Sequence, residues 1–144
     1  MDTAPFVEIR VTQRFAAPAV HVFNAWIDPA QAGLWLFATA SRPVTRLEID
    51  ARASGSFCFV ERNGDTDIEH AGEYIEIDRP RRLVFTLSER NRSRSQSRVN
   101  VEIVPVEIGC ELTLVHENVP PDQASRIEGR WAGMLYGLGT LLGR

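Results

Sequence analysis

The feature that most constrains the fold of this chain is a series of strand-like segments separated by short turns. In residues 6–15, apolar side chains alternate with polar ones from Val7 to Phe15, which is the pattern of a half-buried β-strand. Because consecutive strands joined by short turns pair antiparallel, such a series predicts one antiparallel sheet of six or seven strands. Six further strand signals follow, in residues 44–50, 56–62, 70–78, 81–89, 97–107 and 110–119.

Two short helices are predicted between the first and second strands. Residues 19–27 carry apolar side chains at helical spacing after Pro18, and Pro29 follows Asp28 as a first-turn proline follows an N-cap. A longer helix is predicted from about residue 122, with Asp122 as a plausible N-cap, to about residue 142. This order predicts an α+β fold in which the terminal helix covers the sheet. No repeat or long linker divides residues 1–144, so one domain is expected.

The last stretch of the chain, WAGMLYGLGTLLG at residues 131–143, is almost entirely apolar. A helix needs about 20 consecutive apolar residues to span a membrane, and this run is shorter and follows Arg130 directly. No membrane insertion is therefore expected. A rotation of about 100° per residue places one apolar stripe on the side of Trp131. The stripe contains Ile127, Trp131, Met134, Leu135, Leu138, Leu141 and Leu142.

Glycines lie on the opposite side of this predicted helix. Gly129, Gly133 and Gly137 are spaced by four and fall beside Tyr136. Each interior glycine costs a helix up to about 1 kcal/mol relative to alanine. Two explanations remain open: a solvated face that tolerates this cost, or a smooth groove where a second copy packs in a two-fold homodimer.

Composition narrows the class of protein. The net charge is −3, which argues against a dedicated nucleic-acid partner. The N-terminus has no basic start or apolar segment of the kind that directs export. A cytoplasmic location is therefore expected, with Cys58 and Cys110 as reduced thiols. The arginines between residues 90 and 98 predict a solvated hairpin tip, with an anion-binding loop as the alternative.

Catalytic motifs are absent from the sequence. There is no nucleophile elbow, paired-histidine metal motif or phosphate-binding glycine loop. His21, His70 and His116 lie far apart in the sequence, so neither a metal site nor a cofactor is expected. His116 continues the alternation of Cys110, Leu112 and Leu114. It therefore shares an apolar face and is a candidate to orient a ligand or move a proton, or else a histidine bound to backbone or water at the end of the sheet.

Several segments resemble the START-like (SRPBCC) superfamily of helix-grip proteins. They are RFAAPAVHVFNAWIDPAQAGLW, Gly55 after Arg52, GEYIEIDRPRRLVFTL, LTLVHENVP and a terminal helix near GRW. The closest resemblance is to the branch named after the C-terminal domain of the Hsp90 ATPase activator (AHSA1-like). The chain departs from that pattern at Ser54, at Cys110, and at Arg130, which separates Gly129 from Trp131. These departures put any particular ligand in doubt.

The resemblance implies a curved antiparallel sheet wrapped around the C-terminal helix, with a cavity between them. Such cavities hold apolar small molecules in many relatives. The residues expected to line this one are Trp131 and Leu135 as the roof, Trp35 and Phe37 at the mouth, Phe59, Tyr74 and Phe85 as wall or floor, and His116 as a polar group inside. For each aromatic residue, ordinary core packing is the simpler interpretation.

Three functions follow from this interpretation. The first is binding of a small, mostly apolar molecule without a cofactor. The second is a protein-interaction module directed to a chaperone or a regulator. The third is an enzyme on the same scaffold with His116 as general acid or base. A fold alone does not decide among them.

Overall fold

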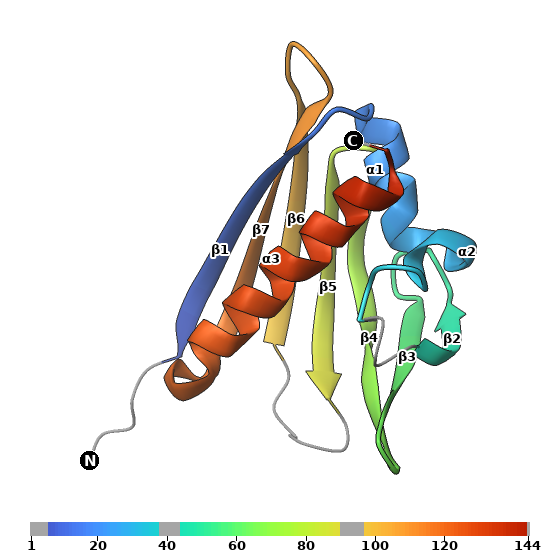
Figure 1. Ribbon diagram of the computed structural model, residues 1–144, viewed down its shortest axis with the longest axis vertical. Helices are drawn as coiled ribbons and strands as arrows, with labels where there is room; N and C mark the ends of the chain where they lie inside the picture. Colours follow the sequence, from blue (N-terminus) through green and yellow to red (C-terminus); the bar gives the residue numbers. More distant parts are fainter. Residues whose placement is uncertain (1–5, 38–43, 90–96, 144) are drawn as a thin grey trace.

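The computed structural model describes residues 6–37, 44–89 and 97–143 (Figure 1). The first helices and strands are β1 (Val7–Phe15), α1 (Ala19–Ile27), α2 (Pro29–Ala32), β2 (Val44–Ile49), β3 (Ser56–Asn63) and β4 (Thr66–Asp78). They are followed by β5 (Arg82–Glu89), β6 (Ser97–Pro105), β7 (Cys110–Val119), the 3₁₀ helix η1 (Pro121–Gln123) and α3 (Ala124–Leu141).

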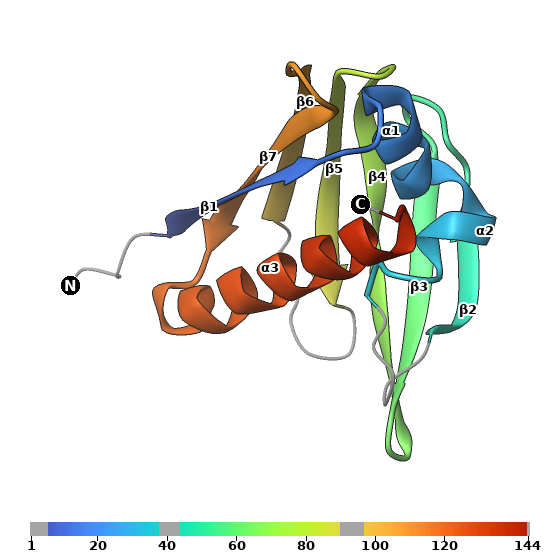
Figure 2. The same ribbon diagram turned by 45° about the horizontal axis from the view of Figure 1, so that its top comes forward.

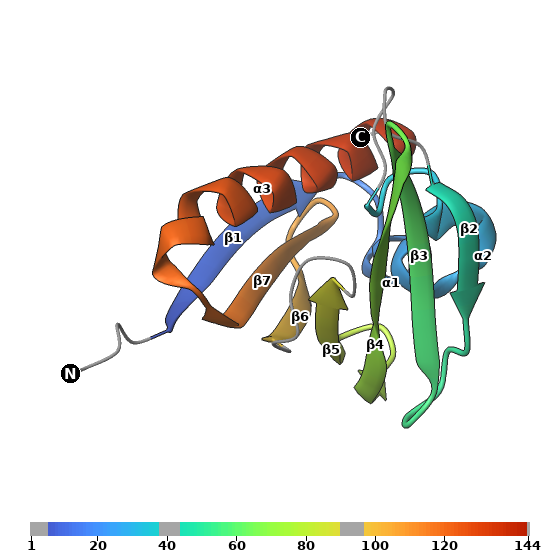
Figure 3. The same ribbon diagram turned by 90° about the horizontal axis from the view of Figure 1, so that it is seen from below.

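All seven strands belong to one antiparallel sheet. Their order is β1-β7-β6-β5-β4-β3-β2, so β1 pairs with β7 at one edge of the sheet and β2 forms the other edge. The sheet curves, and α3 lies across its concave side, as the view from below shows (Figure 3). The short helices α1 and α2 lie next to each other (Figure 2), with α1 close to β6 and α2 close to β2. The predicted α+β helix-grip architecture is confirmed.

Local sequence signals account for several boundaries. The Asp28 side chain accepts a hydrogen bond from the backbone N–H of Ala30, with Pro29 in the first turn of α2. Gly64 takes a φ of 67° in the turn between β3 and β4, a conformation that glycine adopts at little cost. The N-cap prediction for Asp122 is wrong. Asp122 lies within η1, and the residue before α3 is Gln123, which makes no side-chain cap.

The inner face of α3 supplies part of the core. Trp131, Met134, Leu135 and Leu138 are buried, as the periodicity predicts. Leu141 lies in the last turn of α3 and is 41% exposed. The prediction that it belongs to the buried apolar stripe is therefore wrong. Within the described parts of the chain, no helix is both long and apolar enough to cross a membrane.

Surface charges follow the strand pattern. Glu76 on β4 accepts a hydrogen bond at 3.2 Å from Arg82 on the neighbouring strand β5. Arg98 is exposed on β6, whereas Arg90, Arg92 and Arg94 lie outside the described residues.

The glycines of α3 face outward. A Cβ atom built on Gly129, Gly133 or Gly137 meets nothing within 4 Å, and Tyr136 beside them is 62% exposed. The helix therefore does not need these glycines in order to approach its own sheet. Homodimer formation through this face remains a prediction.

We predict that Gly133→Ala and Gly137→Ala each stabilise the protein by about 0.5 to 1 kcal/mol. Alanine lowers the conformational entropy cost of the helix, and its methyl group has open space. Urea denaturation measures the change in the free energy of unfolding. Destabilisation, together with a lower sedimentation coefficient than that of the wild type, would instead show that a second copy packs on these glycines.

Candidate functional site

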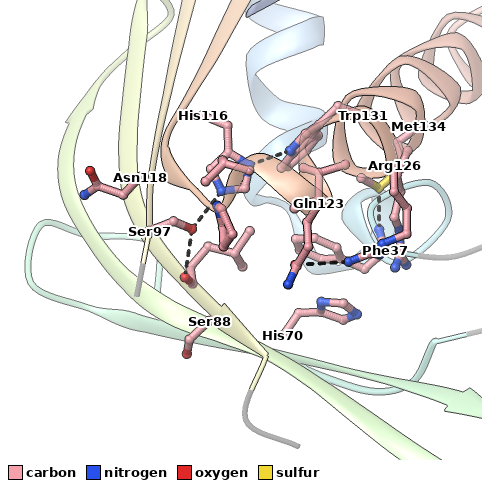
Figure 4. A pocket seen from close by; sticks show the side chains of 15 residues that line it. Phe37, His70, Ser88, Ser97, His116, Asn118, Gln123, Arg126, Trp131 and Met134 are labelled. Carbon is pink, nitrogen blue, oxygen red and sulfur yellow. Dashed lines mark hydrogen bonds between the residues drawn. The ribbon is translucent and has the colours of Figure 1, made fainter. Parts of the chain in front are cut away.

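A cavity of about 90 Å³ lies between the N-terminal half of α3 and the neighbouring ends of β5, β6 and β7. The labelled side chains come from η1 and α3, from these strands, from β4 and from the segment after α2 (Figure 4). Much of the lining is apolar, contributed by Phe37, Leu87, Val119, Ile127, Trp131 and Met134. The polar lining residues include His70, Ser97, His116, Gln123, Arg126 and Arg130.

His116 stands at the centre of a directed chain of hydrogen bonds. Trp131 Nε1–H donates to His116 Nδ1 at 3.0 Å, and His116 Nε2 lies 2.7 Å from Ser97 Oγ. The Ser97 hydroxyl donates its proton to the carbonyl oxygen of Leu87 at 3.1 Å. Because indole N–H only donates and the serine proton is already used, His116 is neutral and carries its proton on Nε2.

The environment of His116 opposes protonation. The residue is 4% exposed, and burial lowers its pKa to about 4. A second proton would have to sit on Nδ1, where the indole proton of Trp131 already points. The histidine therefore joins β7 to α3 as a neutral group.

A second polar cluster lies beside the cavity. Glu61 is fully buried on β3, and its Oε1 accepts hydrogen bonds from His70 Nε2 at 2.7 Å and from Arg130 Nη2 at 2.9 Å. Burial acts to raise the pKa of Glu61, but the hydrogen bonds from His70 and Arg130 and their charges outweigh it and lower the pKa to about 2. The carboxylate is therefore ionised at neutral pH, with Arg130 as its fixed counter-charge.

Phe37 has an unusual backbone conformation at the wall of the cavity. Its φ is 58°, in the left-handed region that bulky residues rarely occupy. The ring stacks on His70 with centroids 4.4 Å apart and planes 4° apart. The backbone N–H lies 3.1 Å from the sulfur of Met134, which is a weak acceptor. Strained residues of this kind cluster at binding sites.

The aromatic residues expected as wall and floor lie deeper in the molecule. Phe59, Tyr74 and Phe85 line a separate void of about 10 Å³, together with Phe37 and Trp26. Burial, followed by the charge of Asp50, raises the pKa of Tyr74 above its usual range. This inner region is nearly filled by rings that contact one another edge to face or at a tilt.

Two expected cavity residues line neither space. Trp35 is buried and donates its indole N–H to the carbonyl oxygen of Ala25 at 2.9 Å. Leu135 is fully buried, and its carbonyl oxygen accepts a hydrogen bond from Gln13 on β1. Of the residues predicted from sequence, the structure brings Phe37, His116 and Trp131 together at the cavity.

Sequence reasoning missed most of the polar groups. His70 lies four residues before Tyr74 on β4, so the alternation of a strand places both side chains on one face. This spacing could have predicted that His70 faces inward with Tyr74. Glu61 and Arg130 are 69 residues apart, and only the placement of α3 brings them together. Within the described ranges no cluster of histidine, cysteine, aspartate and glutamate is arranged to hold a metal ion, and Cys58 and Cys110 are not joined by a disulfide bond.

We predict that His116 makes stability depend on pH. Its pKa rises from about 4 in the folded state to its ordinary 6.5 on unfolding, so the unfolded chain binds more protons below pH 6.5. The free energy of unfolding should therefore fall by about 2 kcal/mol between pH 6.5 and pH 4.5 through this group alone. Glu61 affects stability at lower pH, because its contribution to the free energy of unfolding is lost only as the pH falls from 4.5 towards 2.

Denaturant unfolding at a series of pH values tests this prediction. His116→Gln should lower stability at neutral pH, because it breaks the contact with Trp131, yet it should flatten the dependence between pH 6.5 and pH 4.5. An unchanged slope in this variant would assign the dependence to other groups.

We predict that Arg130→Gln destabilises the protein by about 2 to 3 kcal/mol, because it removes the fixed cation from a buried carboxylate. Arg126→Gln is the matched control. Arg126 lies one turn earlier on α3, is exposed and donates only to Gln123, so its loss should cost less than about 0.5 kcal/mol. Equal effects of the two substitutions on urea denaturation would contradict the prediction.

Comparisons with known proteins agree with this architecture. A protein from Chromobacterium violaceum superposes with a TM-score of 0.86 at 22% identity, over 93% of this chain and 95% of that one. An AHSA1-like protein from Aeromonas hydrophila gives 0.80 at 18% identity, over 93% and 90%. An uncharacterized protein from Rhizobium leguminosarum gives 0.84 at 18%, over 96% and 95%. At such low identities these likenesses show the fold alone.

The family assignment rests on the sequence match. No functionally curated protein matches the chain. Residues 16–143 match the family described as activator of Hsp90 ATPase homolog 1-like protein. This match spans most of the chain and agrees with the order of elements, so the chain belongs to the AHSA1-like family, within the START-like helix-grip fold.

Proposed function

We propose that this protein binds a small, mostly apolar molecule with one polar handle in the cavity under the N-terminal half of α3. The observation that carries the proposal is the cavity itself, which is lined by the apolar side chains of Leu87, Ile127 and Met134 and has the exposed Arg126 at its rim. Ligand sites combine an apolar lining with a few placed polar groups, which is the composition found here.

The polar handle of the ligand is best matched by the side chains at the rim of the cavity. Arg126 is exposed and has Gln123 as its hydrogen-bond partner, at 3.3 Å. Arg130 is already paired with Glu61, and His116 has both ring nitrogens engaged. The net charge of these groups is therefore positive at the rim, which favours a hydrogen-bond acceptor or a carboxylate as the handle.

The cavity volume restricts the ligand. Pockets for drug-sized ligands span roughly 300 to 1,000 Å³, whereas this cavity measures about 90 Å³. A ligand that contains a single ring therefore either extends past the rim of the cavity or displaces one of the side chains that line it. We therefore propose a small aromatic or short aliphatic molecule.

The other interpretations have less support. Acid–base catalysis by His116 would need a free ring nitrogen, but Trp131 and Ser97 occupy both. The large exposed apolar residues come from different parts of the chain, for example Phe6 before β1, Leu34 after α2 and Ile108 between β6 and β7, which gives a protein-interaction surface less support. We also propose a cytoplasmic location, where Cys58 and Cys110 would stay reduced.

We predict that 4-isopropylbenzoate binds in this cavity and changes the tryptophan fluorescence through Trp131. Ile127→Phe should weaken its binding at least about tenfold, since the added ring fills the cavity. Ala132→Phe is the matched control, because Ala132 is exposed on the same helix and the binding should stay as in the wild type. Arg126→Gln should weaken binding about threefold to fivefold, in line with an exposed ion pair.

Native mass spectrometry of freshly purified protein complements the titration by revealing a retained ligand. Equal binding in Ile127→Phe and the wild type would place the ligand elsewhere. No binding of any apolar carboxylate or neutral aromatic compound would contradict the proposed function.

A further inference from the structure

Trp26 carries a buried donor without a partner. The ring is 1% exposed, and its Nε1–H has no hydrogen-bond acceptor among the described residues. The other two tryptophans differ, since Trp35 donates to Ala25 and Trp131 donates to His116. An unpaired buried donor is costly and rare in native proteins, so this one needs an explanation.

The void beside Trp26 does not supply the missing acceptor. It measures about 10 Å³, at the lower limit for holding a single water molecule. Its other lining residues are mostly apolar, including Leu36, Phe57 and Leu83. Tyr74, which also lines the void, is not bonded to the indole N–H either, so Trp26 Nε1 has no acceptor in the described part of the chain.

Phe37 separates this void from the outer cavity. Of the described residues, it alone lines both spaces. Its ring contacts Phe59 and Trp131 edge to face, at centroid distances of 5.3 and 5.9 Å. Its left-handed backbone lies outside regular secondary structure, and among the described residues its N–H has only the weak sulfur acceptor of Met134. Displacement of the ring would join the two spaces.

We infer that the outer cavity and the inner void are two parts of one longer site, divided by the Phe37 ring. The inner end of a bound molecule displaces this ring and places a neutral hydrogen-bond acceptor against Trp26 Nε1. This inference rests on the proposed function and names the ligand class more narrowly. The ligand is an aromatic or aliphatic molecule with a ketone, ester or ether oxygen at its inner end and its handle at the rim near Arg126. The inner end is neutral because the described residues around the void offer no cation.

Two probes of almost equal shape test the inference. 4-Acetylbenzoate and 4-isopropylbenzoate share the ring and the carboxylate, and differ at the inner end, where the carbonyl oxygen of the first is replaced by a methyl group and a hydrogen in the second. The indole N–H signals of the three tryptophans in a ¹H–¹⁵N spectrum report on the inner site. Trp26→Phe assigns the relevant signal, and Trp35→Phe is the matched control that removes an already bonded indole.

Three results are expected. The Trp26 indole proton shifts downfield with 4-acetylbenzoate and not with 4-isopropylbenzoate. Phe37→Ala binds 4-acetylbenzoate about tenfold more tightly than the wild type, the factor expected if the partition is displaced in about one tenth of the free protein. The preference for the ketone is lost in Trp26→Phe and kept in Trp35→Phe.

The outcomes separate this inference from the proposed function. If both probes bind equally and the Trp26 signal does not move, the inner subsite is wrong and the outer cavity stands. If neither probe binds to the wild type or to Phe37→Ala, the proposed function fails and the inference with it. Phe37→Leu replaces Phe37→Ala if the latter does not fold, with the same direction of change expected.

Discussion

Trp131 holds α3 on the sheet through two kinds of contact at once. Its ring packs against Trp26 and Phe37, with centroids 6.0 and 5.9 Å away. Its indole N–H bonds to His116, which passes the chain of hydrogen bonds on to Ser97 at the start of β6. Apolar packing alone allows a helix to slide or rotate on a sheet, whereas a directed bond allows one position. The depth and rotation of α3, and with them the shape of the cavity, depend on this side chain.

The two halves of α3 are held differently. Towards the C-terminus, Leu138 and Gly139 are buried, and a Cβ on Gly139 would lie 3.4 Å from Gln13 and in contact with Phe15, so the helix lies close to β1. Towards the N-terminus, Trp131 packs on Trp26 and Phe37 and bonds to His116, and the pair formed by Arg130 and Glu61 links α3 to β3. Polar side chains therefore make part of the contact that apolar side chains make in the other half. The cavity lies in this half.

Most of the fold could be predicted from sequence because its signals are local. Alternation in β7 and the cap at Asp28 each act over a few residues, and no distant contact overrides them. The same alternation placed His116 correctly on the buried face. The site could be predicted only in part, because its composition depends on pairing register and helix placement. Register sets His70 opposite Phe59, and the curvature of the sheet then decides that Phe59 faces the inner void while His70 faces the outer cavity.

Arg130 illustrates how a departure from a family pattern acquires a physical meaning. In the sequence it only separates Gly129 from Trp131. In the structure it is the counter-charge of a fully buried carboxylate, and it is adjacent to the tryptophan that fixes the helix. A shift of α3 by one residue would rotate both side chains by about 100°, leaving Glu61 without its cation and His116 without its donor. Neighbouring residues thus enforce the same helix position through independent bonds, one ionic and one neutral. Phe37 stacks on His70 and meets Trp131 edge to face, but it takes part in neither bond, so the position of α3 is fixed without this residue.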